Sequence, residues 1–140
     1  MSSTTYNITP GRYSKDLPVT TKTHFKSSTN SYNGTSVKNS PGTVFNLIIH
    51  NTHGGGGSGS AIAFRLYNKA TAPIVGTDVP MIIIHVPSDS SKEINFTSGI
   101  TLTDGIAYSI TGGVSLLDAT AVDADGVQLY MGYVWWLKQV

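Results

Sequence analysis

The sequence predicts an all-β protein, with an antiparallel β-sandwich or jelly-roll-like body at residues 41–140 and an extended N-terminal arm at residues 1–40. Three observations predict this class. The 140 residues include 15 Gly and 6 Pro but only 12% charged side chains, a composition that favours turns over long exposed helices. The only Glu is Glu93, so opposite charges at the four-residue spacing of a helix are almost absent. Segments with two-residue apolar periodicity recur from residue 44 onward.

The arm is distinguished by its lack of apolar side chains. Of residues 1–40, nine are apolar and 16 are Ser or Thr, and five bases with one acid give a net charge of +4. Residues 41–140 carry four bases and seven acids, a net charge of −3, which restores the overall +1. A segment with so little apolar surface cannot offset the conformational entropy of folding by burying itself. We therefore expect residues 1–40 to lie extended on a partner or on the body.

The first predicted strands of the body alternate apolar and polar side chains. Val44–His50 is the first of them and Ala61–Tyr67 is the second. Met81–Val86 is a continuous apolar run between Pro80 and Pro87, which favours a strand covered on both faces. The side chains of the first two strands that we expect to share core-facing positions are Phe45, Leu47, Ile49, Ile62, Phe64 and Leu66.

The second half of the body continues this pattern. Lys92–Thr97 and Ile100–Thr103 are two further predicted strands. Ile106–Ile110 follows across Asp104-Gly105, a residue pair that favours a tight two-residue hairpin. The last predicted strand is Val127–Leu137. The body therefore has about seven strands, or about eight if the arm contributes one, which is the number in a sandwich or jelly roll.

The last predicted strand is bulky on both faces. One face can fill the core, and the other must cover a second sheet, the arm or a neighbouring subunit, because an exposed apolar stripe of this size promotes aggregation. Aromatic side chains are favoured anchors of interfaces, although packing within the chain explains the pattern equally well. Stacking of a carbohydrate on Trp135 or Trp136 is a third interpretation. The candidate subunit-interface residues are Tyr130, Tyr133, Val134, Trp135 and Trp136.

The sequence carries no signature of catalysis or of a cofactor. No Cys is present, which excludes disulfides, thiolate zinc sites and a cysteine nucleophile. No G-x-S-x-G motif occurs, and no His lies in a recognisable triad setting. We therefore predict no catalytic residues, no cofactor and no enzymatic activity.

Three histidines, His50, His53 and His85, come nearest to a metal site. Residues three apart on a strand point to opposite faces, so His50 and His53 cannot chelate one ion unless the chain turns at Asn51. The segment Asp123–Gly126 is similar to the start of a calcium loop but lacks the bidentate Glu, and we interpret it as an acidic turn. We predict no metal site.

Composition also excludes two classes of partner. The bases of the arm are widely spaced and include a single Arg, whereas tracking of phosphates needs denser Lys and Arg. No run reaches the roughly 18 apolar residues of a membrane helix, and the start lacks the charged and then apolar regions of a secretory signal. We expect no nucleic-acid partner, no membrane association and no export.

The segment Leu66-Tyr-Asn-Lys-Ala-Thr-Ala-Pro-Ile-Val-Gly-Thr-Asp-Val-Pro80, followed by Ile84-His-Val-Pro87, resembles a widespread family of small virion and prophage proteins of tailed bacteriophages. Further matching segments are Gly99-Ile-Thr-Leu, Ile110-Thr-Gly-Gly113 and Asp118-Ala-Thr-Ala-Val122. The resemblance covers roughly residues 42–134 in order, so the arm lies outside it. It implies a β-sandwich or jelly-roll module with a structural role on the head or tail of the particle.

The leading hypothesis is a capsid decoration or cement protein, made in the host cytoplasm and placed on the outer surface of a phage head. The arm would bridge subunits of the major capsid protein, and many such contacts would together clamp the lattice. A homotrimer would cover the second face of the last strand. The candidate capsid-binding residues of the arm are Tyr6, Ile8, Arg12, Tyr13, Lys15, Leu17, Lys22, Phe25 and Lys26.

Two alternatives stay open. The first is a tail or head-fibre module that recognises a host surface, with the glycine-rich hairpin loop Gly54–Gly59 as its contact. The second is a free carbohydrate-binding module that uses Trp135 or Trp136.

Overall fold

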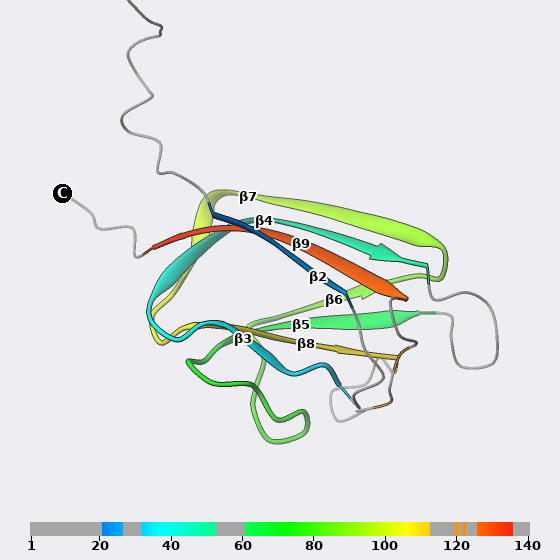
Figure 1. Ribbon diagram of the computed structural model, residues 1–140, viewed down its shortest axis with the longest axis horizontal. Helices are drawn as coiled ribbons and strands as arrows, with labels where there is room; N and C mark the ends of the chain where they lie inside the picture. Colours follow the sequence, from blue (N-terminus) through cyan, green and yellow to red (C-terminus); the bar gives the residue numbers. More distant parts are fainter. Residues whose placement is uncertain are drawn as a thin grey trace, which may run out of the picture.

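The computed structural model describes residues 21–26, 32–52, 61–112, 120, 122 and 126–135. Within these ranges all regular secondary structure is β-strand, which confirms the predicted all-β class. No helix in these ranges has the length and apolar character that crossing a membrane requires. Figure 1 shows the eight strands of the described residues, which are β2 (Thr21–Lys26), β3 (Thr35–Lys38), β4 (Gly42–Asn51), β5 (Ile62–Asn68), β6 (Ile82–Val86), β7 (Ser90–Leu102), β8 (Ile106–Thr111) and β9 (Val127–Trp135).

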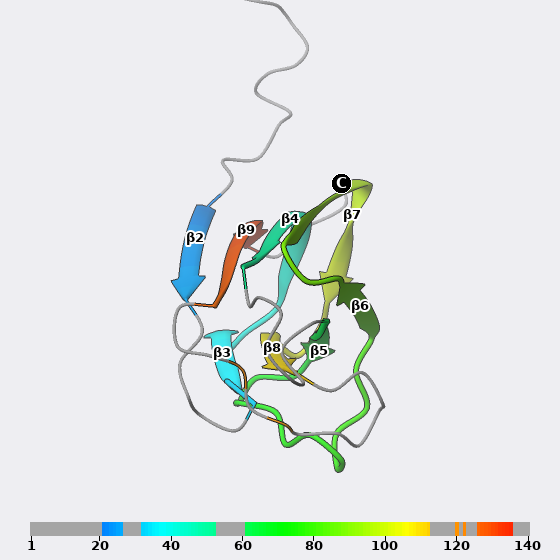
Figure 2. The same ribbon diagram turned by 90° about the vertical axis from the view of Figure 1, so that its right-hand side faces the viewer.

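The strands form two antiparallel sheets that pack face to face, as Figure 2 shows. The first sheet has the order β2-β9-β4-β7 and the second has the order β3-β8-β5-β6. Every link between consecutive strands crosses from one sheet to the other, except the link from β5 to β6. Two four-stranded sheets connected in this way form an eight-stranded jelly roll, so the predicted sandwich architecture is confirmed.

The core lies between the two sheets and follows the two-residue periodicity of the strands. Leu47 and Ile49 of β4 are buried there as predicted. Phe45 is half-buried and outside the buried core cluster, and Val44 takes the core position instead. The reason is a β-bulge between Val44 and Asn46, which shifts the register by one residue and reverses the side-chain alternation before it. The predicted core side chains of β5 that are buried in this cluster are Ile62, Phe64 and Leu66.

The two strands predicted around residues 92–103 are one strand, β7. Asn95 pairs with Asn46 and Ile100 pairs with Val44, so β7 carries several extra residues opposite the bulge of β4. Gly99 lies in this stretch with φ of 77°, a left-handed conformation. A Cβ atom at Gly99 would lie 2.5 Å from Cγ2 of Thr43. Glycine therefore fits this stretch of β7, where a larger residue would have a strained backbone and a close contact with Thr43.

The tight hairpin predicted at Asp104-Gly105 is not formed. β7 belongs to the first sheet and β8 to the second, so this turn carries the chain between the sheets. The backbone amide of Asp104 donates to Oδ1 of Asn68 at 2.7 Å. A Cβ atom at Gly105 would lie 2.6 Å from the carbonyl oxygen of Lys38 and 2.7 Å from Cα of Ala70. The glycine is needed for this close packing, and not for a hairpin.

The boundary between arm and body predicted at residue 40 does not match the extent of the sandwich. Two strands precede it: β2 pairs with β9 and β3 pairs with β8. These segments add to edges that already exist, so backbone hydrogen bonds compensate for their small apolar content. Phe25 of β2 also packs its ring 5.0 Å from that of Tyr108 in the opposite sheet. Residues 1–20 lie outside the described residues.

The outward-facing side chains of β5 are buried as well. Arg65 and Tyr67 of β5 have almost no exposed surface. Arg65 donates from Nη1 to Oγ1 of Thr111 at 2.5 Å, and the hydroxyls of Tyr67 and Ser109 lie 3.2 Å apart. These bonds join β5 to β8 on the outer side of the sheet. They give hydrogen-bond partners to buried polar side chains, whose burial without partners would destabilise the fold.

Candidate functional site

An exposed group of large apolar side chains lies on and beside β6. We call Ile74, Val79, Met81 and Ile83 the apolar surface; their exposed fractions are 50%, 82%, 50% and 38%. In the second sheet β6 is the terminal strand and pairs only with β5 among the described strands. These four residues lie within one short stretch of the chain, residues 74–83, and contiguous exposed apolar patches in soluble proteins mark contacts with a partner. The feature therefore marks a candidate protein-binding surface.

This arrangement corrects the prediction that Met81–Val86 is covered on both faces. Ile84 and Val86 face the core, whereas Ile83 and His85 are exposed. A continuous apolar run is typical of a central strand, but here it lies at an edge, where its outward side chains remain accessible. The apolar run therefore predicted the strand correctly but gave no information about the position of the strand in the sheet.

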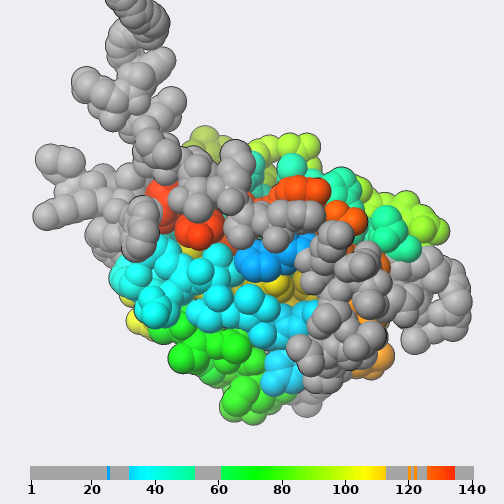
Figure 3. All heavy atoms as spheres, viewed as in Figure 1, coloured from blue at the N-terminus to red at the C-terminus, as the bar shows by residue number. Residues whose placement is uncertain are grey.

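The loop that precedes β6 is held in place by Asp78. Its Oδ2 atom accepts from Nζ of Lys69 at 2.5 Å and from the backbone amide of Ile74 at 2.7 Å. The amides of Thr77 and Asp78 donate to the carbonyl of Ile74, and the amide of Met81 donates to that of Leu66. Figure 3 shows this loop in green at the surface, next to the cyan residues of β3. The loop that carries Ile74 and Val79 of the apolar surface is therefore held in a defined conformation by hydrogen bonds.

We predict that this loop responds to acid. The hydrogen bond from Lys69, followed by that from the Ile74 amide, lowers the pKa of Asp78 below its ordinary value of 3.8. A lowered pKa means that the interaction is fully present above pH 3.8 and is lost as the pH falls through the lowered value. The NMR shift of the Ile74 amide proton should titrate with that midpoint, and Asp78→Asn should abolish the titration. A midpoint at or above the ordinary value would contradict the bonding described.

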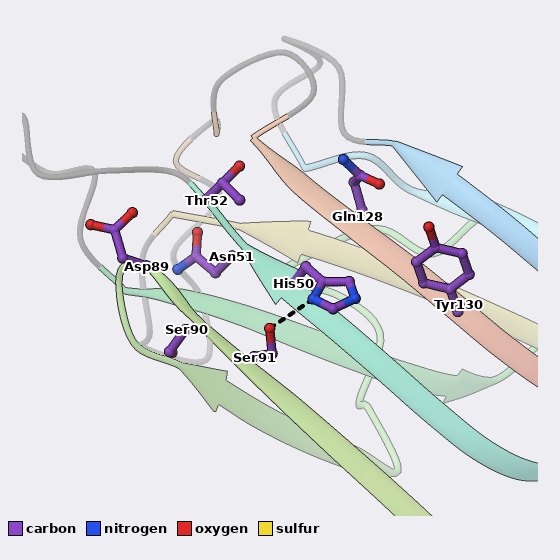
Figure 4. A pocket seen from close by; sticks show the side chains of 8 residues that line it. All are labelled: His50, Asn51, Thr52, Asp89, Ser90, Ser91, Gln128 and Tyr130. Atoms are coloured by element: carbon purple, nitrogen blue, oxygen red, sulfur yellow. Dashed lines mark hydrogen bonds between the residues drawn. The ribbon is translucent and has the colours of Figure 1, made fainter.

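A second candidate site is a pocket of about 410 Å³ on the outer side of the first sheet. We call it the His50 pocket. Figure 4 shows that its side chains come from the end of β4, the start of β7 and the start of β9, with His50 between Ser91 and Tyr130. The register explains this grouping, because His50 pairs with Ser91 on one side and with Gln128 on the other. The lining residues are His50, Asn51, Thr52, Asp89, Ser90, Ser91, Gln128 and Tyr130.

The imidazole of His50 is fixed on two sides. Its Nδ1 atom lies 2.7 Å from Oγ of Ser91, at hydrogen-bond distance. On the other side the ring of Tyr130 meets it edge to face, with centroids 5.8 Å apart and planes at 87°. Tyr130 keeps 39% of its surface exposed. The pair thus presents an aromatic surface with a defined orientation.

The base of the pocket is tied to both sheets. The buried amide of Asn51 donates to the carbonyl oxygens of Val86 and Pro87, each at 3.0 Å. Thr52 donates from its backbone amide and its hydroxyl to the carbonyl of Gly126, at 2.9 and 3.0 Å. These bonds fix the end of β4 against the end of β6 and the start of β9. These hydrogen bonds therefore hold the pocket in a fixed shape before any ligand binds.

The lining of the pocket offers hydrogen-bonding side chains and one exposed aromatic ring. In the described ranges, no three His, Cys, Asp or Glu side chains lie together in a way that would hold a metal ion. His50 and His85 lie on different sheets, and His53 is outside the described residues. His50 and Ser91 are the residue types that act as general base and nucleophile in many hydrolases. In the described part of the chain, however, no carboxylate bonds to His50 to orient its ring.

The pairing of His50 with Ser91 cannot be predicted from local sequence patterns, because the two residues are 41 positions apart and lie on different strands. The two-residue alternation of the strands does predict which side chains of the pocket point outward. His50, Gln128 and Tyr130 all occupy outward positions of their strands, the positions opposite to Ile49 and Leu129 of the core. Only the strand order shows that these outward positions meet.

The predicted subunit-interface residues have separate locations. Tyr130 is exposed and lines the His50 pocket. Tyr133 is partly buried against the core, and Val134 is 3% exposed, so the structure does not bring Val134 to the surface of the chain. Trp135 is the last residue of β9, its side chain is outside what the structure describes, and Trp136 lies beyond the described residues.

The predicted arm residues divide in the same way. Phe25 is partly buried and packs on Tyr108 and the core, a contact within the chain that was not predicted. Lys22 and Lys26 belong to β2, opposite Gly132 and Gln128 of β9. The remaining predicted residues, which lie outside the described residues, are Tyr6, Ile8, Arg12, Tyr13, Lys15 and Leu17. The loop Gly54–Gly59 lies outside the described residues, and the acidic turn Asp123–Gly126 lies outside them except for Gly126.

No protein-family model and no curated protein matches this chain. Among solved structures, it is similar to a Bacillus endospore appendage of a family of disulfide-linked pili, with 12% identity and a TM-score of 0.45 over 94% of this chain and 100% of the other. It is also similar to the Tobacco streak virus coat protein dimer, with 12% identity and a TM-score of 0.42 over 92% of each chain. A second structure of that coat protein gives 14% identity and a TM-score of 0.35 over 86% of this chain and 89% of the other. At such low identities and TM-scores these likenesses carry no inference about what this chain binds or assembles with.

Proposed function

We propose that this chain is a structural protein of a virus particle and acts as a capsid decoration protein. The observation that carries the proposal is the apolar surface beside β6, a strand that pairs only with β5 among the described strands. Exposed apolar side chains next to a strand edge combine two means of contact, because the side chains bury apolar area and the backbone can pair with another strand. The sequence resemblance to small virion proteins of tailed bacteriophages supports the particle as the setting.

The proposed mechanism is non-covalent bridging between subunits. The apolar surface contacts one neighbouring subunit, and residues 1–20 reach another, a subunit of the major capsid protein or a second copy within a homotrimer. A chain of this length spans up to about 70 Å when extended. Each contact is weak by itself, and two linked contacts together bind far more tightly than either. The chain acts by binding on the outer surface of the head, without catalysis and without a cofactor.

Electrostatic attraction has a smaller part in this mechanism than the full arm suggested. Lys22 and Lys26 belong to β2, and the segment before it carries only Arg12 and Lys15 against Asp16, a net charge of +1. A single exposed charge is screened by salt within about 10 Å. Apolar contacts and backbone pairing are therefore expected to provide most of the attachment.

We predict that deletion of residues 1–20 leaves the jelly roll folded and weakens attachment to capsids about tenfold or more. The eight described strands all begin at or after Thr21, so the sandwich keeps its core. Co-sedimentation with capsids that lack this protein measures the attachment, and circular dichroism checks the fold. A full-length chain with Tyr6, Ile8, Tyr13 and Leu17 changed to Ser is the matched control for length. Undiminished attachment of both variants would rule out a bridging role for the segment.

A host-recognition module on the tail or a head fibre is the second candidate function, and the His50 pocket is the observation that favours it. The two functions place the protein differently. Density at many regular positions on the head supports a decoration protein, whereas density confined to the tail vertex supports the recognition module.

A further inference from the structure

We propose that the His50 pocket binds a neutral saccharide. The inference uses side chains of the first sheet, whereas the proposed decoration function uses the apolar surface at β6. It therefore adds a ligand to a chain whose attachment is explained by other residues.

The lining of the pocket matches the chemistry of a sugar ring. A pyranose has a face of C–H groups that packs on an aromatic ring, and a periphery of hydroxyls that both donate and accept hydrogen bonds. Tyr130 offers an exposed ring oriented by His50. Polar groups line the rest of the pocket: Gln128 lies on the same strand as Tyr130, Ser91 lies on the other side of His50, and Asp89 lies at the side of the pocket away from Tyr130. A few fixed polar groups around an aromatic surface are typical of small-molecule sites.

The charge of the pocket argues against other ligands. Asp89 is the only carboxylate among the lining residues, and none of them is Lys or Arg. A phosphate or sulfate would meet the carboxylate of Asp89 and no Lys or Arg among the lining residues, which is unfavourable. A lipid chain would find mostly polar lining groups, which disfavours an apolar occupant. Since no group of three metal ligands occurs in the described residues, a neutral polar molecule is the class that remains.

The size and stiffness of the pocket fit this class. A volume of about 410 Å³ lies within the range of small-molecule sites. The contact of Nδ1 with Ser91 orients the His50 ring and leaves Nε2 as the nitrogen for a ligand. Asn51 and Thr52 hold the surrounding backbone against Val86, Pro87 and Gly126. A ligand therefore binds with little further ordering of the protein.

The pocket and the apolar surface can be occupied together. Asn51, at the base of the pocket, bonds to Val86 at one end of β6. Met81 and the loop that carries Ile74 and Val79 lie at the other end of that strand. Figure 1 shows the loop, in green, and the arrowhead of β4 toward opposite ends of the sandwich. A chain attached through its apolar surface therefore keeps the His50 pocket accessible.

The test is an array of neutral mono- to pentasaccharides probed with the full-length chain, followed by calorimetric titration of each saccharide that binds. Tyr130→Ala is expected to reduce the affinity about tenfold or more, whereas Tyr130→Phe, which keeps the ring, should retain it within about threefold. His85→Ala is the matched control, because it removes an exposed imidazole from the other sheet. Circular dichroism verifies the fold of each variant.

Three results would overturn the inference: no neutral saccharide binds the chain, binding occurs only with sulfated or phosphorylated sugars, or Tyr130→Ala binds as well as the unchanged chain. The same variants are tested for co-sedimentation with capsids. Normal attachment of Tyr130→Ala together with lost saccharide binding supports both proposals as separate functions. Lost attachment with retained saccharide binding in Val79→Asp would show that the two surfaces act independently.

Discussion

Replacing Val79 with aspartate is expected to reduce attachment of the chain to capsids about 30-fold or more, the change that about 2 kcal/mol produces. Val79 is the most exposed member of the apolar surface, at 82%, so the free chain loses little packing when it is changed. In a contact with another subunit the new carboxylate would be removed from water without a partner, which is strongly unfavourable. Co-sedimentation with capsids that lack the protein measures the loss.

The control for this variant is Thr97→Asp, which adds the same charge at an exposed position of the edge strand β7 in the other sheet. It should attach like the unchanged chain. Ile83→Ser, which removes apolar area without adding charge, should give a smaller loss in the same direction. Attachment of Val79→Asp at the level of Thr97→Asp would show that the apolar surface is not a capsid contact.

The second large effect concerns stability. Phe64→Ala is expected to lower the free energy of unfolding by about 3–5 kcal/mol. The Phe64 side chain is fully buried between the sheets, and its ring stacks on that of Tyr108 with centroids 5.8 Å apart and planes at 26°. Truncation leaves a cavity and removes this aromatic contact. Because domains of this size have about 5–15 kcal/mol of stability, this loss removes a large fraction of the free energy of unfolding.

Urea denaturation followed by tryptophan fluorescence measures this effect. Phe64→Leu, which keeps most of the volume, should cost about 1 kcal/mol. A loss below about 1 kcal/mol for Phe64→Ala would mean that the core between the sheets is not packed as described.

Sequence reasoning was most accurate where one face of a strand is buried. The alternation of Ile62, Phe64 and Leu66 with polar or small residues identified both the strand and its core-facing side, because the period of a strand is fixed by its geometry. It failed by one residue at Val44 and Phe45, where a bulge shifts the alternation. A bulge depends on what the partner strand does, and the residues of β4 alone do not encode it.

The arrangement of strands was less predictable than their existence. Asp104-Gly105 has the composition of a hairpin turn, yet it connects the two sheets, since its close packing against Lys38 and Ala70 has the same requirement for glycine. The two candidate sites could not be predicted for the same reason, because strand order is not evident from the sequence. The apolar surface depends on β6 being an edge, and the His50 pocket depends on three strands meeting. Both are properties of strand order, which no local pattern records.

The position of β9 between β2 and β4 has a consequence for the synthesis of this protein. The first described strand bonds to the last, so a nascent chain emerging from the ribosome holds β2 without its partner until residues 127–135 have been made. The first sheet can therefore be completed only after β9 has been synthesised, and a chain terminated before Val127 would lose a central strand together with the attachment point of β2.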